Sequence, residues 1–103
     1  MADLTIVYWR DIPAQVIAKA GRRSAKAELP RRFMEAIDAA AMHVGAIGTD
    51  DYLAGWRRGE AMPCADDLDA AVAETVAAID KAYDTAHIRI LIERGGNEDA
   101  SAR

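Results

Sequence analysis

The run at residues 4–9, LTIVYW, is the stretch that most constrains how this chain can fold. Its residues are β-branched, aliphatic or aromatic, and such side chains fit a pleated, half-buried surface. Because the run is nearly continuous rather than alternating, it predicts a central strand covered on both faces. Pro13 cannot donate to a strand ladder and holds Ile12 extended, so the strand should end before it. Arg10 and Asp11 are therefore expected at the C-terminal mouth of a buried strand.

The next segment predicts a hairpin. A short strand begins at Val16 and Ile17, Gly21 and Arg22 make a tight turn, and residues 24–29 return. A helix over residues 14–20 is the alternative, because the alanines in this segment are poor strand formers.

A first helix is expected to start with Pro30, which fits the first helical position. Gly45 and Gly48 should end it. Apolar residues recur at spacings of three and four and predict one buried stripe: Phe33, Ile37, Ala40, Ala41 and Val44. Arg31 and Arg32 lie in the first turn, where cations oppose the helix dipole. They are either a solvated pair compensated by acidic residues or an anion site beside the free helix N–H groups.

The segment at residues 49–64 has two interpretations. Thr49, Asp50 and Asp51 resemble a helix start, with Tyr52, Leu53 and Trp56 on one face. Residues 56–62 can instead form an extended strand.

The clearest helix covers residues 66–83, with Asp66 as its N-cap. Its expected apolar face consists of Leu68, Val72, Thr75, Val76, Ile79 and Tyr83. Ile88, Ile90 and Ile92 then alternate as in a strand, but Asp84 as a cap and Gly95–Gly96 as an end favour a helix slightly. Residues 96–103 are polar and are expected to be a disordered tail.

These elements predict one α+β domain over residues 1–95, in which a small, mostly antiparallel sheet has two main helices packed on one face. The net charge of −4 argues against general binding to nucleic acid or anionic membranes. Residues 1–32 carry seven Lys/Arg against three Asp/Glu, whereas residues 59–103 carry four against ten. No apolar run approaches the ~18 residues of a membrane span, and no signal-peptide pattern opens the chain, so a cytoplasmic location is expected.

No motif for catalysis or metal binding stands out. A glycine-rich phosphate loop, a nucleophile elbow and a paired-histidine metal motif are all missing, so we expect no catalytic residue, metal or cofactor. His43, His87 and Cys64 could meet at a metal only through long-range folding. Cys64 is interpreted as an inert thiol, with a reactive thiol near a helix N-terminus as the alternative.

Aromatic and arginine residues are the best candidates for binding, because tryptophan, tyrosine and arginine dominate binding hot spots. The candidate binding residues are Trp9, Arg10, Asp11, Gln15, Arg31, Tyr52, Trp56, Arg57 and Arg58. We expect Arg10 and Arg57 to lie near each other, beside Trp9 or Trp56. The alternative is that both tryptophans belong to the core of a chain with only six aromatic residues.

Three stretches carry a resemblance to a known family. They are YWRDIPAQVIAKAGRRSAKAELPRRFMEAIDAAAMHVG, TDDYLAGWRR and PCADDL, and WRDIPAQV is the most distinctive piece. Over roughly residues 4–94 the chain resembles the small "virulence factor" domain, which also occurs beside helical repeats in conserved virulence factor C proteins. That name describes a phenotype and implies no mechanism. Stand-alone members look like neighbours of genes for folate- and corrinoid-dependent methyl transfer, so the resemblance implies an accessory role in one-carbon metabolism.

Two functions are therefore expected. The first is a non-enzymatic accessory or protein-interaction domain, whose partner would be a methyltransferase component. The second is a small-molecule binder or small enzyme subunit that grips an anionic, folate-like ligand through Arg10, Arg31, Arg57 and Arg58. A basic cleft with aromatic walls would favour the second function. A flat patch, or tryptophans fully in the core, would favour either the first function or a purely structural role for these residues.

Overall fold

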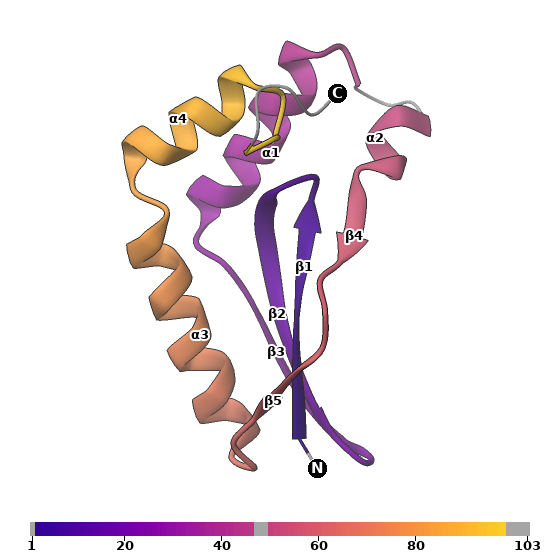
Figure 1. The fold of residues 1–103 in the computed structure, drawn as a ribbon, viewed down its shortest axis with the longest axis vertical. Coiled ribbons are helices and arrows are strands. Elements are labelled where there is room, and N and C mark those ends of the chain that lie inside the picture. Colours follow the sequence, from indigo (N-terminus) through magenta and orange to yellow (C-terminus); the bar gives the residue numbers. More distant parts are fainter. Residues whose placement is uncertain (1, 47–49, 99–103) are drawn as a thin grey trace.

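The computed structural model describes residues 2–46 and 50–98 and has an antiparallel sheet with helices packed against one side (Figure 1). The α+β class and the mostly antiparallel sheet are confirmed. In chain order, the described part contains β1 (Ala2–Trp9), β2 (Ile12–Ala20), β3 (Arg23–Glu28), α1 (Arg31–His43), α2 (Asp50–Ala54), β4 (Trp56–Arg58), β5 (Met62–Cys64), α3 (Leu68–Ala82) and α4 (Thr85–Glu93).

The strand β1 is central, as its sequence predicts. The sheet order is β3-β2-β1-β4, with β5 pairing the start of β1, and all of these pairs are antiparallel. The expected hairpin of β2 and β3 is confirmed, and the alternative helix over residues 14–20 is wrong. A second hairpin, also with a two-residue turn, joins β1 to β2 through Arg10 and Asp11, and Pro13 lies inside β2 rather than in a loop.

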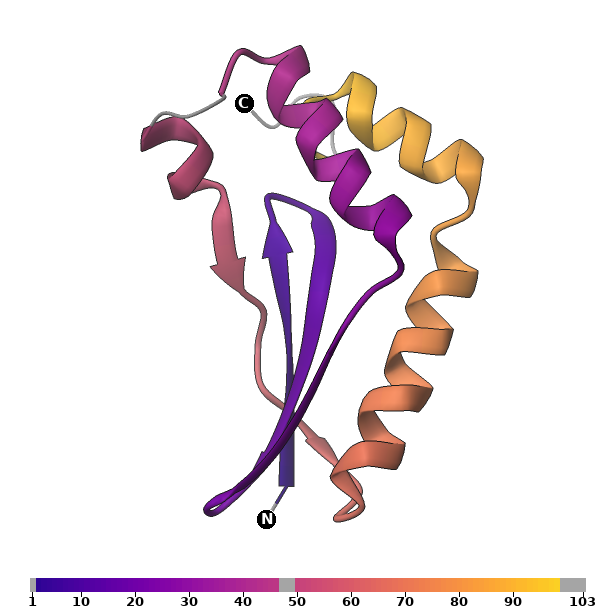
Figure 2. The same ribbon diagram turned by 180° about the vertical axis from the view of Figure 1, so that it is seen from behind.

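The expectation that residues 4–9 are covered on both faces holds only in part. Leu4 and Trp9, which alternate onto opposite sides of the strand, are buried, whereas the residues between them are half-buried. Figure 2, from behind, again shows α3 running alongside the strands and α1 crossing their upper end. Thr5 and Val7 fit the strand through their β-branched shape, which suits a pleated surface without requiring complete burial.

The helix α1 begins one residue later than predicted. Pro30 is the residue before the helix, and the first helical residue is Arg31. The apolar stripe is confirmed at Phe33, Ile37, Ala40 and Ala41, but Val44 is 45% exposed because the helix has already ended at His43. Gly45 follows with a φ of 72°, the left-handed conformation that commonly ends helices. Gly48 lies outside the described residues.

The helix α3 is confirmed, with a different cap. Asp67, not Asp66, accepts a hydrogen bond from the backbone N–H of Ala70. Leu68, Val72 and Ile79 are buried as expected, whereas Thr75, Val76 and Tyr83 are half-buried.

Both interpretations of residues 49–64 hold in part, because the strand expected over residues 56–62 is confined to residues 56–58 and a separate strand starts at Met62. The helix α2 comes first and the strand β4 follows it, while Thr49 lies outside the described residues. Leu53 is 64% exposed, so it does not share a buried face with Tyr52 and Trp56. The helical interpretation of the last segment is also confirmed, with Asp84 as the cap of α4. No helix in the described ranges combines the length and apolar character that a bilayer crossing requires.

Val72 and its neighbour Ala73 provide a matched test of this packing. Val72 is buried against the sheet and Ala73 is exposed on the same helix. We expect Val72→Asp to unfold the domain, because an uncompensated buried carboxylate costs about 3–5 kcal/mol. Ala73→Asp should keep the wild-type melting curve, measured by circular dichroism. A folded Val72→Asp variant would contradict this packing.

Candidate functional site

The two-residue turn between β1 and β2 is clasped between distant parts of the chain. Arg10 has a φ of 55°, a conformation that glycine normally supplies in such hairpin turns. Its backbone N–H donates to the carbonyl of Gly55 at 2.7 Å, and that of Asp11 donates to the carbonyl of Gly96 at 2.8 Å. The ends of α2 and α4 therefore hold the turn in its strained shape.

We call this arrangement the clasp: the turn residues Arg10 and Asp11 and the carbonyls of Gly55 and Gly96 that hold them. Arg57 of β4 completes it. Its Nε donates to the carbonyl oxygen of Arg10 at 2.7 Å, and its Nη2 lies 3.0 Å from Asp11 Oδ1. The guanidinium also stacks over the Tyr8 ring at 4.5 Å. The expected proximity of Arg10 and Arg57 is confirmed, and their contacts are to the turn itself.

Trp9 is a core residue, with no exposed surface. Its indole Nε1 donates to the carbonyl of Tyr52 at 2.8 Å, and the two rings lie 5.8 Å apart. Gly55 and Gly96 approach the indole so closely that an added Cβ would lie 2.5 Å and 2.9 Å from it. The alternative that Trp9 is structural therefore fits, whereas Trp56 keeps part of its surface exposed.

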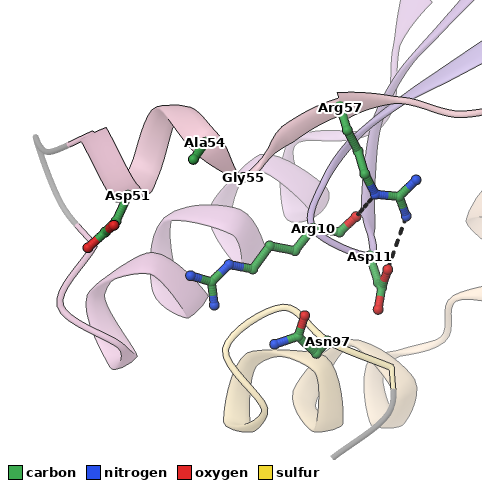
Figure 3. Close-up of a pocket in the computed structure, with 7 residues that line it drawn as sticks. All are labelled: Arg10, Asp11, Asp51, Ala54, Gly55, Arg57 and Asn97. Atoms are coloured by element: carbon green, nitrogen blue, oxygen red, sulfur yellow. Dashed lines mark hydrogen bonds and ion pairs between the residues drawn. The ribbon is translucent and has the colours of Figure 1, made fainter. Parts of the chain in front are cut away.

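A hollow of about 500 Å³ opens beside the turn (Figure 3). Its lining residues are Arg10, Asp11, Asp51, Ala54, Gly55, Arg57 and Asn97. Two arginines face two aspartates here, and one arginine is already paired with Asp11. Arg10 donates through Nη1 to the carbonyl of Gly95 at 2.8 Å and lies over the Trp9 ring. The hollow is therefore mixed in charge rather than a basic cleft.

A second cavity, which we call the groove, lies on the other side of the strands from α3. It has a volume of about 480 Å³ and is lined by Val7, Ala14, Gln15, Glu28, Leu29, Arg31, Met34 and Trp56. The groove brings together three candidate binding residues from separate elements: Gln15 from β2, Arg31 from α1 and Trp56 from β4. Met34 stands at its wall with 42% of its surface exposed.

The groove belongs to a larger surface, the open face, which we define as the side of the sheet that faces away from α3. Cross-strand partners share a face, so the register places Arg58, Val7, Gln15 and Glu28 in one row across it. Thr5, Ile17 and Lys26 form the next row. Arg57 precedes Arg58 and therefore points to the opposite side, toward Tyr8.

The paired arginines at the start of α1 have separate roles. Arg32 pairs with Asp80 of α3 at 2.8 Å and stacks over Phe33 at 4.4 Å. The compensation of this charge by the acidic second half of the chain is thus confirmed for Arg32. Arg31 instead borders the groove.

Several residues of these sites were not among the candidates. Met34, Leu29 and Val7 form apolar walls of the groove, and Asn97 lines the hollow. A signal for Met34 was available, because it is an apolar residue placed off the buried stripe of its own helix. Leu29 and Val7 gave no such signal, since each sits in an ordinary strand-like run.

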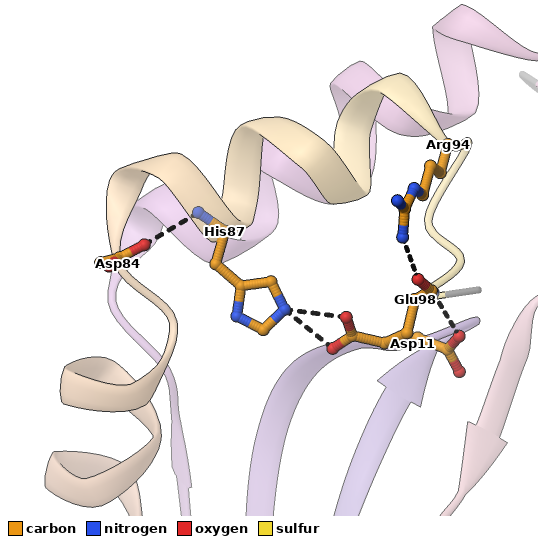
Figure 4. A network of polar contacts seen from close by, with 5 residues as sticks. All are labelled: Asp11, Asp84, His87, Arg94 and Glu98. Carbon is orange, nitrogen blue, oxygen red and sulfur yellow. Dashed lines mark hydrogen bonds and ion pairs between the residues drawn. The ribbon is translucent and has the colours of Figure 1, made fainter. Parts of the chain in front are cut away.

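The segment after α4 is held against the clasp (Figure 4). Residues 96–103 were expected to be a disordered tail; the structure describes them as far as Glu98, and the rest lies outside the described residues. The backbone N–H of Glu98 donates to Asp11 Oδ2 at 2.7 Å, and Arg94 donates to the Glu98 carbonyl. The carboxylate of Glu98 lies 2.8 Å from His87 Nε2.

Two side chains near this segment, His87 of α4 and Tyr83 at the end of α3, have shifted pKa values. The hydrogen bond with Glu98 raises the pKa of His87 above its ordinary 6.5, against a smaller opposing effect of burial. Burial raises the pKa of Tyr83, whose ring stacks on His87 at 4.7 Å, to about 12. Tyr83 thus stays neutral while His87 gains a proton readily.

In the part of the chain that the structure describes, no three histidine, cysteine, aspartate or glutamate residues gather in a way that could hold a metal ion. His87 is engaged with Glu98, His43 is exposed at the end of α1, and Cys64 lies half-buried in β5 beside Ala2.

Residues 7–92 match the family described as Virulence factor, from the second half of β1 almost to the end of α4. The chain belongs to this family. The match includes the whole WRDIPAQV segment, which forms the end of β1, the clasped turn and the start of β2. No curated protein and no solved structure matches the chain.

The close approach of Gly55 to Trp9 can be tested in a double-mutant cycle. We expect Gly55→Ala to destabilise the domain by about 1–3 kcal/mol, because its Cβ would overlap the indole nitrogen edge. In a Trp9→Phe background the same change should cost less, since phenylalanine lacks the five-membered ring that the Cβ meets. Urea denaturation of the four proteins measures the coupling, and equal costs in both backgrounds would contradict the contact.

The His87–Glu98 pair predicts a pH-dependent stability. Because the folded pKa of His87 is raised, the stabilisation is fully present below the unfolded value of 6.5 and is lost as pH rises through the folded pKa. Wild type should therefore exceed Glu98→Gln in stability at about pH 6 and match it at about pH 9. An NMR titration of His87 should show its pKa falling in Glu98→Gln; an unchanged titration would contradict the pairing.

Proposed function

We propose that this chain is a non-enzymatic accessory domain that binds a partner protein through the open face of its sheet. The observation that carries the proposal is the groove, where Trp56, Met34 and Val7 expose apolar surface within a polar rim. A partly exposed tryptophan beside an arginine and a glutamine is typical of the centre of a protein interface.

The residues that stabilise the turn are different from those that line the groove, and this supports the same proposal. The side chains of Trp9, Arg57 and Asp11 are committed to the clasp. Gln15, Arg31 and Trp56 share the groove instead, where a partner can reach them. Binding there would leave the contacts that hold the turn intact.

The partner that we propose is a component of a folate- and corrinoid-dependent methyl-transfer system. This rests on the family, because the resemblance associates stand-alone members with genes for that chemistry. An accessory domain of this kind would position or stabilise a larger enzyme, and the reaction would take place on the partner.

A second candidate function is the binding of a small anionic ligand, such as a folate, in the hollow beside the turn. One observation favours it: Arg10 lines the hollow, and the hydrogen bond of its guanidinium within the described residues goes to a neutral carbonyl. Against it, Asp51 lines the same hollow and brings a negative charge toward any anion.

Two exposed methionines of α1 provide the test. Met34 borders the groove, whereas Met42 is 64% exposed two turns further along and does not line it. We expect Met34→Glu to keep the fold and to lose the partner that immobilised wild type retains from native lysate, because a charge enters the apolar contact. Met42→Glu, the matched control, should retain that partner, identified by mass spectrometry as a methyl-transfer component.

Retention of the same partner by Met34→Glu would contradict binding at the open face. A retained partner that takes no part in methyl transfer would overturn only the assignment to that system. Titration with folic acid, followed calorimetrically, distinguishes the second function: binding by wild type that is lost in Arg10→Gln would favour the hollow instead.

A further inference from the structure

We infer that the groove receives an acidic segment of the partner that carries one large apolar side chain. The inference rests on the proposed function and specifies the chemistry of the partner. The apolar side chain would enter between Trp56 and Met34, and the carboxylates beside it would face Arg31 and Arg58.

The open face has the opposite charge to the protein as a whole. The chain carries a net charge of −4, yet the exposed charged residues on this side are mostly cations. Among the charged residues that the strand register and the groove lining place on this side, four are cations and two are carboxylates: Lys19, Lys26, Arg31 and Arg58 against Asp3 and Glu28. A surface of this kind attracts a negatively charged partner and suppresses a positively charged one.

The cations nearest the groove, Arg31 and Arg58, are in none of the ion pairs found among the described residues, so they can pair with carboxylates of a partner. Asp3 lies opposite Lys19 in the register, so these two compensate each other locally. Among the described residues, the arginines in ion pairs are Arg32 and Arg57, which lie away from the groove. Arg31 borders the groove directly, and Arg58 ends the row that crosses its floor.

The walls of the groove indicate that the partner segment carries a large apolar side chain beside its acidic residues. Trp56, Met34, Val7 and Leu29 provide apolar contact, and the volume of about 480 Å³ lies within the roughly 300–1,000 Å³ of cavities that bind compact ligands. Methionine adapts its shape to different side chains. Gln15 offers both a donor and an acceptor, which can pair with a peptide group of an extended segment.

Trp56 makes the inference measurable. Of the two tryptophans, Trp9 is fully buried and Trp56 lines the groove, so a ligand in the groove should change the fluorescence of Trp56. The full-length chain is used to select binders from a displayed library of random twelve-residue peptides. Peptides that survive selection are synthesised without tryptophan and titrated against wild type and against Trp56→Phe, in which the fluorescence change should vanish.

We expect the selected peptides to be enriched in aspartate and glutamate around a leucine, isoleucine, methionine or phenylalanine. Their affinity should fall with rising salt. It should fall about tenfold or more in the double variant Arg31→Glu, Arg58→Glu, because two attractions become two repulsions. The matched control, Lys81→Glu with Arg89→Glu, changes the same charge at exposed positions of α3 and α4 and should bind like wild type.

Peptides without acidic enrichment, or equal affinity for the charge-reversed and control variants, would overturn the inference. The two failures are distinguishable. If Met34→Glu retains the natural partner, the proposed function fails. If Met34→Glu loses the partner while the Arg31→Glu, Arg58→Glu variant keeps it, the open face is the binding surface and only the acidic chemistry is wrong.

Discussion

The burial of one indole ring is the interaction on which the rest of this structure depends. Trp9 ends the central strand, donates its indole N–H to the carbonyl of Tyr52, and is covered by Gly55 and Gly96. These contacts bring together the end of β1, the helix α2 and the segment after α4. A chain with six aromatic residues obtains its largest buried area at this point, and the two glycines are required because any side chain would overlap the ring.

The clasp around Trp9 determines which polar residues remain for binding. Arg10 and Asp11 must turn the chain within two residues, so their backbone N–H groups need acceptors, which Gly55 and Gly96 provide. Arg57 then neutralises Asp11 and caps the turn carbonyl. Each of these groups is committed to the fold. The surface that stays available is the open face, where Trp56 stacks edge-on against Tyr52 and continues the aromatic row outward from Trp9.

The sequence predicts elements better than it predicts the roles of single residues. Periodicity identified α1, α3 and the hairpin of β2 and β3, because these patterns depend on neighbours along the chain. Asp66 and Asp67 are equally good caps by type, and only the backbone geometry selects Asp67. The aromatic and arginine residues do gather near one another, as expected. The sequence pattern could not show which of them stabilise the turn and which line the groove. Whether Arg57 or Arg58 faces the clasp depends on the register of a three-residue strand, which pairing with β1 decides.

The groove lies beside one irregularity of the sheet. The pairing of β1 with β2 shifts between Val7 and Tyr8, which leaves Ala14 as an extra residue opposite them. Such a bulge bends its strand and increases the local twist. The carbonyl of Ala14 accepts a hydrogen bond from the backbone N–H of Leu29, so the chain leaves the sheet here and starts α1 above Gln15. Arg31 and Met34 therefore stand over the groove because the bulge directs the chain there, and the WRDIPAQV segment specifies the clasp at one end and the floor of the groove at the other.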